Sequence, residues 1–247
     1  MYIFGSVNAL SRPHSLMSNI IRLTQEFYEQ RREATDMGTS QEIIEANHVG
    51  WNSIENQIKA FEIATDLSWI DWEKIESVLD VGCGYGKLLD FLNSQKFYKG
   101  KYCGIDIVPE FIKKAIDIHD NKDRNDFILG DFLEQNWNHE KFDFVISLGG
   151  LGVNHDYPEQ FGQKSVVYAQ RLISKIVEHS KLAISLYFPN ADNIDYSKRK
   201  PRMAYHSMSE IETIVIKACG KRCEDITFTS YPDKKNVKTI AKIKLLS

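Results

Sequence analysis

The sequence predicts an α/β fold, a doubly wound and mostly parallel seven-stranded sheet with an N-terminal helical extension. From Ser77 onward, short apolar runs alternate with stretches of helical periodicity, which is the pattern of a parallel sheet with helices on both faces. A glycine-rich turn follows the first apolar run. The link at 231–236 between the last two strand-like stretches is too short for a parallel crossover, so the last strand is expected to run antiparallel.

Length and composition agree with this class. The chain has 247 residues, of which 43% are hydrophobic and 26% charged, and it can bury a large core. Its formal net charge of −3 does not indicate a polyanionic partner, so nucleic acid is not expected. No stretch approaches the roughly 20 apolar residues of a membrane span. The four cysteines are best interpreted as reduced thiols without a metal, and we expect a cytoplasmic location.

Residues 1–70 carry helical stripes but no strand. The spacing of apolar residues predicts helices over 15–32 and from about Ser53 to Trp69. Because this stretch has too few apolar residues to close a core alone, we expect a helical cap or lid rather than an independent domain. The alternative is that these helices pad one edge of the sheet.

Residues 71–247 are expected to form the main domain. Four helices are expected at 87–94, 109–118, 165–179 and 210–218. The seven strands are expected at 78–81, 102–106, 126–129, 142–148, 182–188, 225–230 and 237–246.

The first strand ends in the turn Asp80-Val81-Gly82-Cys83-Gly84-Tyr85-Gly86, followed by a helix. Glycines let the backbone approach a ligand closely, and Asp106 lies about 20 residues beyond, where a ribose-binding acid is expected. A dinucleotide site would need Gly-x-Gly-x-x-Gly, but Lys87 holds the place of its third glycine. The acidic Asp80 suits a cationic or amino-bearing ligand better than a pyrophosphate. A nicotinamide cofactor is therefore disfavoured.

Four segments, in order, carry a family resemblance. The segment VLDVGCGYGKLLDFL resembles the first motif of class I S-adenosylmethionine-dependent methyltransferases, and YCGIDIVPEFIKKA, FILGDFLEQ and FDFVISLGG are similar to the next three. The resemblance covers about residues 50–247. It implies the fold described above, S-adenosylmethionine as the cofactor, and residues 71–247 as the methyltransferase domain.

The resemblance also implies roles for the glycine turn. Gly82, Gly84 and Gly86, with Cys83 among them, would pass beneath the methionine and ribose parts of the cofactor. Asp80 would contact or orient the region of the methionine amino group. The structural alternative for Asp80 is that it only caps the turn.

The adenosine part has its own implied contacts. Asp106 would accept from both ribose hydroxyls, Ile107 would lie against the adenine ring, and Asp131 would accept from the exocyclic amine, with Phe132 closing the adenine pocket. The alternative for Asp106 is a helix N-cap ahead of Pro109.

Ser147 and Leu148 follow from the fourth motif and would border the reacting methyl group. The residues after them lack the Asn/Asp-Pro-Pro-aromatic signature of enzymes that methylate planar amino groups, and the acidic clusters of magnesium-dependent O-methyltransferases are not recognisable. Methyl transfer needs alignment of the reactants and a base only when the acceptor must lose a proton. We therefore expect metal-independent transfer to an O or N atom of a small molecule.

The residues that would bind the methyl acceptor are indicated less specifically than the cofactor residues. Its pocket is expected from residues 1–60 and from the loop 189–206. The candidate bases are His155, His48 and His206, and the candidate acceptor contacts are Trp51, Tyr157 and Tyr205. Each of the loop histidines could instead be solvated, and Trp51 could be a core residue.

Two other functions remain open. An RNA or protein methyltransferase would be favoured by a folded basic face around 198–202, Lys221 and Arg222. A non-catalytic, cofactor-binding partner subunit would be favoured by an acceptor pocket that core side chains block. The sequence does not indicate an oligomeric state.

Overall fold

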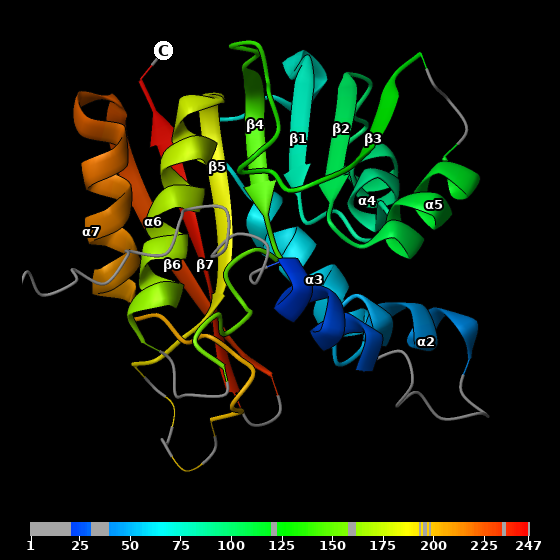
Figure 1. Ribbon diagram of the computed structural model, residues 1–247. Coiled ribbons are helices and arrows are strands. Elements are labelled where there is room, and N and C mark those ends of the chain that lie inside the picture. Colours follow the sequence, from blue (N-terminus) through cyan, green and yellow to red (C-terminus); the bar gives the residue numbers. More distant parts are fainter. Residues whose placement is uncertain are drawn as a thin grey trace, which may run out of the picture.

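The computed structural model describes residues 21–30, 40–119, 123–157, 162–192, 194, 197, 199–233 and 236–246. It confirms the predicted sheet. The strand order is β3-β2-β1-β4-β5-β7-β6, and β7 alone runs against its neighbours β5 and β6 (Figure 1). The strands are β1 (Ser77–Val81), β2 (Lys101–Asp106), β3 (Asn125–Leu129), β4 (Phe142–Ser147), β5 (Ser180–Pro189), β6 (Cys223–Asp233) and β7 (Asn236–Leu245).

Helices cover both faces of the sheet. In Figure 1, α6 and α7 lie in front of the sheet and α4 lies behind it. Residues 21–30 are also helical; the rest of the helix predicted over 15–32 falls outside the described residues. The labelled helices are α2 (Gln41–His48), α3 (Ile54–Thr65), η1 (Trp72–Lys74), α4 (Lys87–Gln95), α5 (Pro109–Ile118), α6 (Gln163–Glu178), α7 (Met208–Cys219) and η3 (Gly220–Arg222).

The N-terminal helices differ in part from the expectation. Helix α2 was not predicted from the sequence. Its only buried residue is Ala46, so its apolar stripe is weak. The Ser53 hydroxyl caps α3 by accepting from the Asn56 N–H. That helix ends at Thr65 rather than near Trp69. At this end, the Trp72 indole donates to the Thr65 carbonyl (3.2 Å).

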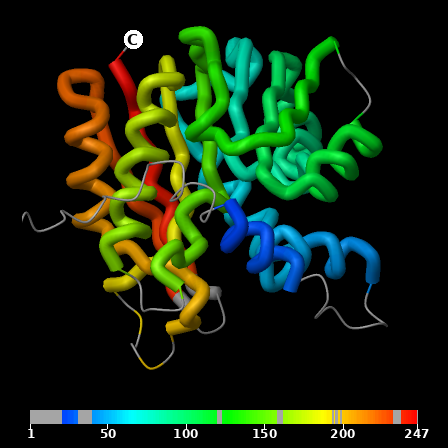
Figure 2. Tube along the Cα trace, in the orientation of Figure 1, coloured from blue at the N-terminus to red at the C-terminus, as the bar shows by residue number. Residues whose placement is uncertain are grey.

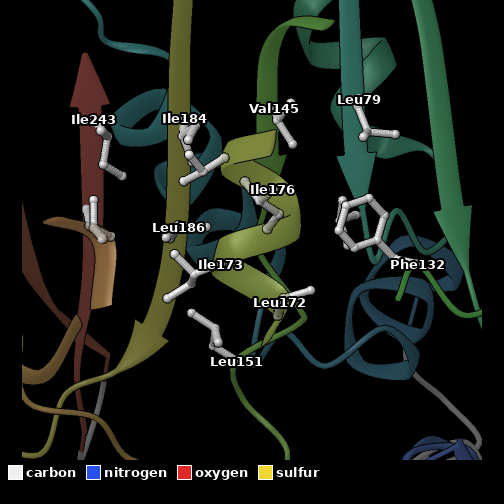
Figure 3. Packing of buried hydrophobic residues seen from close by; sticks show 14 of the residues in the cluster. Leu79, Phe132, Val145, Leu151, Leu172, Ile173, Ile176, Ile184, Leu186 and Ile243 are labelled. Carbon is white, nitrogen blue, oxygen red and sulfur yellow. The ribbon is translucent and has the colours of Figure 1, made fainter. Parts of the chain in front are cut away.

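Each face of the sheet has its own core. On one face, Ile173 and Ile176 of α6 belong to one cluster with Ile184 and Leu186 of β5, and Leu172 extends the same cluster beside Leu151 (Figure 3). A second cluster, on the opposite face, joins α3 and α4 to β1, β4, β5 and β7. Successive strand residues therefore contribute to opposite cores, as expected for a sheet that is buried on both sides.

Polar contacts also attach α3 to the sheet. The Ser185 hydroxyl of β5 donates to the Ala64 carbonyl (2.7 Å), and the Lys242 ammonium of β7 donates to the Asp66 carbonyl (3.1 Å). Ala60 and Ala64 of α3 are completely buried. This helix is thus a layer of the main domain, whereas residues 21–30 and α2 lie beside the edge of the sheet (Figure 2).

That edge is where the parallel strands end. The carboxyl ends of β1 to β5 meet there, and β7 begins there because it runs in the opposite direction. Ligands of open α/β sheets bind at this edge.

In the described part of the chain, no helix is long and apolar enough to cross a membrane. The four cysteines are free thiols, and the cytoplasmic location stays a prediction.

Candidate functional site

A pocket at the carboxyl edge of the sheet, here named the main pocket, brings together most of the predicted cofactor residues. It also has walls from the helical residues 21–30 and from the segment around Trp51. Gly86 and Ser147 are the predicted cofactor residues that do not line it. The ones that do are Asp80, Gly82, Cys83, Gly84, Asp106, Ile107, Asp131, Phe132 and Leu148.

The glycine turn has the backbone that only glycine adopts readily. Gly82, Gly84 and Gly86 have φ angles of 82°, 54° and 73°, in the left-handed region. The turn is fastened to β2, because the Gly82 N–H donates to the Ile105 carbonyl (2.8 Å). Gly86 is the N-cap of α4, and a Cβ there would come within 2.9 Å of the His119 ring. Gly86 therefore contributes to the turn through close packing against His119 and does not line the pocket.

Asp106 holds the turn as well as lining the pocket. Its Oδ2 accepts from the Gly84 N–H (2.9 Å) and its Oδ1 from the Val108 N–H (3.0 Å). The N-cap of α5 is Val108, so Asp106 is not itself the N-cap. Burial raises the pKa of Asp106 to about 6, against the lowering effect of the backbone hydrogen bonds. Each carboxylate oxygen can still accept a further hydrogen bond from a ligand.

Asp80 lies deeper, with 4% of its surface exposed. The Tyr102 hydroxyl donates to its Oδ2 (2.6 Å). Burial raises the pKa of Asp80 to about 7; the Tyr102 hydrogen bond lowers it, and the nearby charge of Asp106 raises it further. At neutral pH this carboxyl is therefore close to half protonated, and a cationic ligand would favour its ionised form.

Two buried polar side chains of the main pocket have unsatisfied atoms. Asp131 accepts from the Leu133 N–H through Oδ1 (2.8 Å), but its buried Oδ2 has no hydrogen-bond partner among the described residues. Both ring nitrogens of His155 also lack one there, and its ring lies 4.2 Å from that of Tyr168. Unmet buried polar groups are costly. Their presence in one pocket therefore fits a polar organic ligand.

The histidine ring is held neutral. Burial lowers the pKa of His155 to about 4, and 3% of its surface is exposed. Of the three candidate bases, His155 is the one that lines the main pocket. His48 instead lies 3.2 Å from the Tyr85 hydroxyl through Nδ1, and His206 pairs with Glu210 at 3.0 Å.

Ser147 supports the wall of the pocket. Its hydroxyl donates to the Val81 carbonyl (3.0 Å) and accepts from the Gly150 N–H (3.3 Å). It thereby ties the end of β4 to the end of β1. Its neighbours Leu148, Gly149 and Gly150 line the pocket in its place.

The predicted acceptor contacts separate in the structure. Trp51 is buried and lines the main pocket. Tyr157 lies beneath the guanidinium of Arg202 (4.4 Å to the ring centre). Tyr205 is buried, and its hydroxyl accepts from the Lys200 N–H (3.1 Å). Neither tyrosine lines a cavity beside Trp51; both instead shape the loop that precedes α7.

A second cavity adjoins the main pocket, and we name it the side cavity. The two share Tyr28, Val49, Trp51, Leu148 and Gly149. Beyond this common wall, the side cavity is lined by residues from β5, β7 and the loop before α7. They include Tyr187, Pro189, Lys200, Met203 and Lys238.

Sequence reasoning missed several lining residues. Tyr28, Gln57, Tyr85 and Tyr168 line the main pocket, and none was predicted. Tyr85 had a signal, because it lies within the glycine turn. Tyr28, Gln57 and Tyr168 lie in helices whose docking on the strand ends is decided by long-range packing.

The chain matches a known family model. A model described as a methyltransferase domain matches residues 73–241, which is more than half of the chain. Over 150 residues, 58% of this chain, the sequence is 29% identical to the 18S rRNA (guanine-N(7))-methyltransferase of Bos taurus, covering 50% of that protein. Over 52 residues, 21% of this chain, it is 44% identical to a candidate methyltransferase of Mycobacterium tuberculosis, covering 31% of it. The chain thus aligns with half or less of these relatives.

Solved structures show the same fold. Magnesium protoporphyrin IX methyltransferase of Synechocystis PCC 6803, with bound S-adenosylhomocysteine, matches with a TM-score of 0.60 at 17% identity, covering 94% of this chain and 100% of that one. A phosphoethanolamine N-methyltransferase of Haemonchus contortus matches with a TM-score of 0.58 at 14% identity, covering 88% and 59%.

These findings define the class of the protein. The chain belongs to the methyltransferase-domain family and has the class I fold of the S-adenosylmethionine-dependent enzymes. The main pocket has the acids, glycine turn and unsatisfied polar atoms that suit S-adenosylmethionine.

Proposed function

We propose that the protein transfers a methyl group to an O or N atom of a small-molecule acceptor without a metal ion. The observation that carries this proposal is the side cavity, because it shares a wall of five residues with the main pocket. An acceptor in the side cavity would lie directly against the contents of the main pocket. Two of its other lining residues, Tyr187 and Lys238, are buried, which favours a small ligand.

The roles of the cofactor residues are part of the same proposal. S-adenosylmethionine supplies a methyl group activated on a sulfonium. Asp106 accepts from the ribose hydroxyls while its oxygens keep the turn in place. The unpartnered Oδ2 of Asp131 accepts from the adenine amine, and Asp80 attracts the cationic end of the ligand. Leu148 borders the reacting centre.

His155 acts as a neutral polar contact in this proposal rather than as a strong base. With a pKa of about 4, its ring takes up a proton poorly near neutral pH, whereas an effective general base has a pKa near the working pH. In the main pocket, alignment and exclusion of water are then the principal contributions of this chain.

An RNA acceptor is the second candidate, because one relative is named as an rRNA methyltransferase. The basic residues considered above give it limited support. Arg222 donates to the carbonyls of Val177 and Ser180. Arg199 and Arg202 lie over the rings of Tyr205 and Tyr157. These contacts use the guanidinium groups within the fold.

A labelling experiment tests the proposal. The full chain and labelled S-adenosylmethionine are incubated separately with the small-molecule, RNA and protein fractions of a cell extract, with the Asp106→Ala variant as control. Label is expected in the small-molecule fraction with the unaltered chain only. Label in the RNA or protein fraction instead would overturn the small-molecule acceptor.

A further inference from the structure

His155 is held in place by the start of α6. Its backbone N–H donates to the Ser165 hydroxyl (3.0 Å), and that hydroxyl donates to Oδ2 of Asp156 (2.7 Å). The Asp156 carboxylate also accepts from the backbone N–H groups of Lys164 and Ser165 (3.0 and 2.9 Å). The backbone that carries the histidine ring is therefore anchored to the helix, so the ring is positioned by the fold itself.

The loop with His155 pairs with the loop before α7. Val153 forms an antiparallel bridge with Met203, and the Asn154 N–H donates to the Arg202 carbonyl (2.9 Å). Met203 lines the side cavity, whereas Val153 and His155 line the main pocket. One pair of loops thus contributes to both cavities, and His155 belongs to it.

The acids that are proposed to bind adenosine come from another part of the sheet. Asp106 ends β2 and Asp131 follows β3. In the strand order, β1 separates both of these strands from β4, which leads into the loop of His155. We therefore assign the methyl acceptor, rather than the adenosine part of the cofactor, to the histidine ring.

The ring of His155 has two unmet hydrogen-bonding atoms. Both nitrogens are buried and have no hydrogen-bond partner among the described residues. Burial lowers the pKa of His155 to about 4, so the neutral ring has one N–H donor and one lone pair. Its neighbours in the pocket include Leu148, Val153 and Tyr168, and the Tyr168 ring centre lies 4.2 Å away. Such a ring suits an uncharged polar group on an aromatic or apolar molecule.

An uncharged hydroxyl fits this ring better than a charged group does. A hydroxyl can donate to the lone pair of the ring without bringing a charge into a buried site. An alkyl amine is cationic near neutral pH and must lose a proton before it attacks a methyl group. A ring with a pKa of about 4 takes up that proton poorly. A carboxylate would place an anion against a ring that burial keeps neutral.

We propose that the methyl acceptor carries an uncharged hydroxyl group on an aromatic or apolar body, and that this hydroxyl donates to the unprotonated ring nitrogen of His155. The hydrogen bond orients the hydroxyl oxygen, and Leu148 and Tyr168 contact the body of the acceptor. On transfer, a C–O bond forms as the C–S bond breaks, its electron pair stays on sulfur, and the hydroxyl proton leaves to water. This inference rests on the proposed function, because it names the acceptor class of the same site.

Probes that share one ring test the preference for a hydroxyl. The full chain, with isotope-labelled histidine nitrogens, is saturated with S-adenosylhomocysteine and titrated with phenol, aniline, fluorobenzene and the anion benzoate. We expect phenol to bind about five-fold or more tightly than fluorobenzene, and more tightly than aniline or benzoate. In nuclear magnetic resonance spectra, phenol should shift the signal of the unprotonated nitrogen of His155, and fluorobenzene should not.

Variants then assign the preference to one side chain. His155→Phe should remove the preference for phenol, and His155→Gln, which keeps a donor and an acceptor, should retain part of it. His179→Phe is the matched control, because His179 is also buried, its Nδ1 donates to the Glu140 carbonyl (2.7 Å), and it lines neither cavity. The control should keep the full preference, and all three variants should bind S-adenosylhomocysteine within a few-fold of the unaltered chain.

The outcomes separate the two proposals. If the unaltered chain does not bind S-adenosylhomocysteine, the proposed function fails. If it binds that ligand but binds phenol no more tightly than fluorobenzene, aniline or benzoate, the hydroxyl subsite is wrong. A His155 signal that S-adenosylhomocysteine shifts and phenol leaves unmoved would assign the ring to the cofactor and also overturn the subsite. The comparison of phenol with fluorobenzene uses the unaltered chain, so it decides the matter even if His155→Phe does not fold.

Discussion

The main pocket and the side cavity share one wall but are built in different ways. The main pocket is formed where β1, β2 and β4 end, and its polar groups include backbone amides of the glycine turn and the side chains of Asp80, Asp106, Asp131 and His155. The side cavity is lined mainly by aromatic rings and lysines, which come from residues 27–28 and 49–52, from β5 and β7, and from the loop before α7.

This difference matches two tasks. A pocket made by strand ends and a tight turn depends on local geometry, because Asp106 and the glycine turn hold each other through short hydrogen bonds. A cavity made by side chains distant in the sequence can change its lining without disturbing that turn. Binding of the cofactor and choice of acceptor are therefore separable, and the variants below test that separation.

The largest effect is expected for Asp106→Ala. It removes a charged acceptor and releases the N–H groups of Gly84 and Val108. Two charge-assisted hydrogen bonds are worth about 3 kcal/mol or more, so affinity for S-adenosylhomocysteine should fall roughly a hundred-fold. Calorimetry measures it, with the exposed Asp126→Ala on neighbouring β3 as control. An unchanged dissociation constant would mean that Asp106 serves the turn alone.

The pH dependence of cofactor binding should come from Asp80. With a pKa of about 7, its carboxyl is largely protonated at lower pH and must lose that proton to attract a cationic ligand. Affinity for S-adenosylmethionine should therefore rise with pH and level off above about pH 7, changing at most roughly ten-fold per pH unit below it. Titrations between about pH 5 and about pH 8 test this. Asp80→Asn should lose the change near pH 7 and keep only the change that Asp106, with a pKa of about 6, contributes at lower pH. The same slope in Asp80→Asn would assign it to another group.

A smaller effect is expected for His155→Phe. The folded pKa of His155 lies near 4, below its unfolded value of about 6.5, so the unfolded chain binds the proton first as pH falls. Its contribution to stability is therefore complete above about pH 6.5 and is lost as pH falls toward about 4. Phenylalanine removes this dependence and two unmet ring nitrogens, and it should raise the free energy of unfolding by about 1 kcal/mol.

Chemical denaturation at about pH 5 and about pH 8 measures this gain, which should be larger at the lower pH. If His155 contacts the ligand, the same variant should bind S-adenosylhomocysteine a few-fold more weakly. Tyr168→Phe is the matched control for His155→Phe, because it alters the neighbouring ring and leaves the histidine in place. A loss of stability in His155→Phe at both pH values would show that the ring has partners in the folded protein.

The smallest effect concerns access to both cavities. We propose that residues 21–30 and 40–52, rather than all of residues 1–70, are a mobile cover, because α3 belongs to the sheet packing. The polar contacts of residues 21–30 and α2 with the domain include those of Gln25, which donates to the Ile107 carbonyl, and Glu45, which accepts from the Lys114 ammonium. Limited proteolysis near residues 48–51 should slow about two-fold or more with S-adenosylhomocysteine bound. Equal rates would favour static padding.

Much of the fold could be predicted because its signals are local. Apolar runs separated by helical stretches identify buried parallel strands, and the short link before β7 allows only an antiparallel pair. The acids of the main pocket could be predicted for the same reason, since each lies at the end of a strand. The sequence could not show that both oxygens of Asp106 bind backbone amides, or that Ser147 faces the β1 backbone, because both depend on how neighbouring strands align.

The six candidate residues of the acceptor side do not come together in one cavity. Of six candidate residues, His155 and Trp51 line a cavity, whereas His48, His206, Tyr157 and Tyr205 have partners elsewhere. Position near a strand end is insufficient for a loop residue, because a loop can turn its side chains either way. Lys238 carried no signal at all, since a lysine in a strand near the end of the chain is ordinarily solvated.

The amino-acid sequence by itself therefore determined the class of the protein, its sheet and the acids and glycines of the main pocket, because hydrophobic periodicity and turn chemistry act over a few residues. Only the tertiary structure decided the acceptor side. This side brings together three distant parts of the chain, represented by Trp51, Tyr187 and Lys238. They meet because β7 pairs antiparallel with β5 and because the segment around Trp51 packs against both strands at the same edge. The charge and shape of that cavity follow from packing over the whole chain.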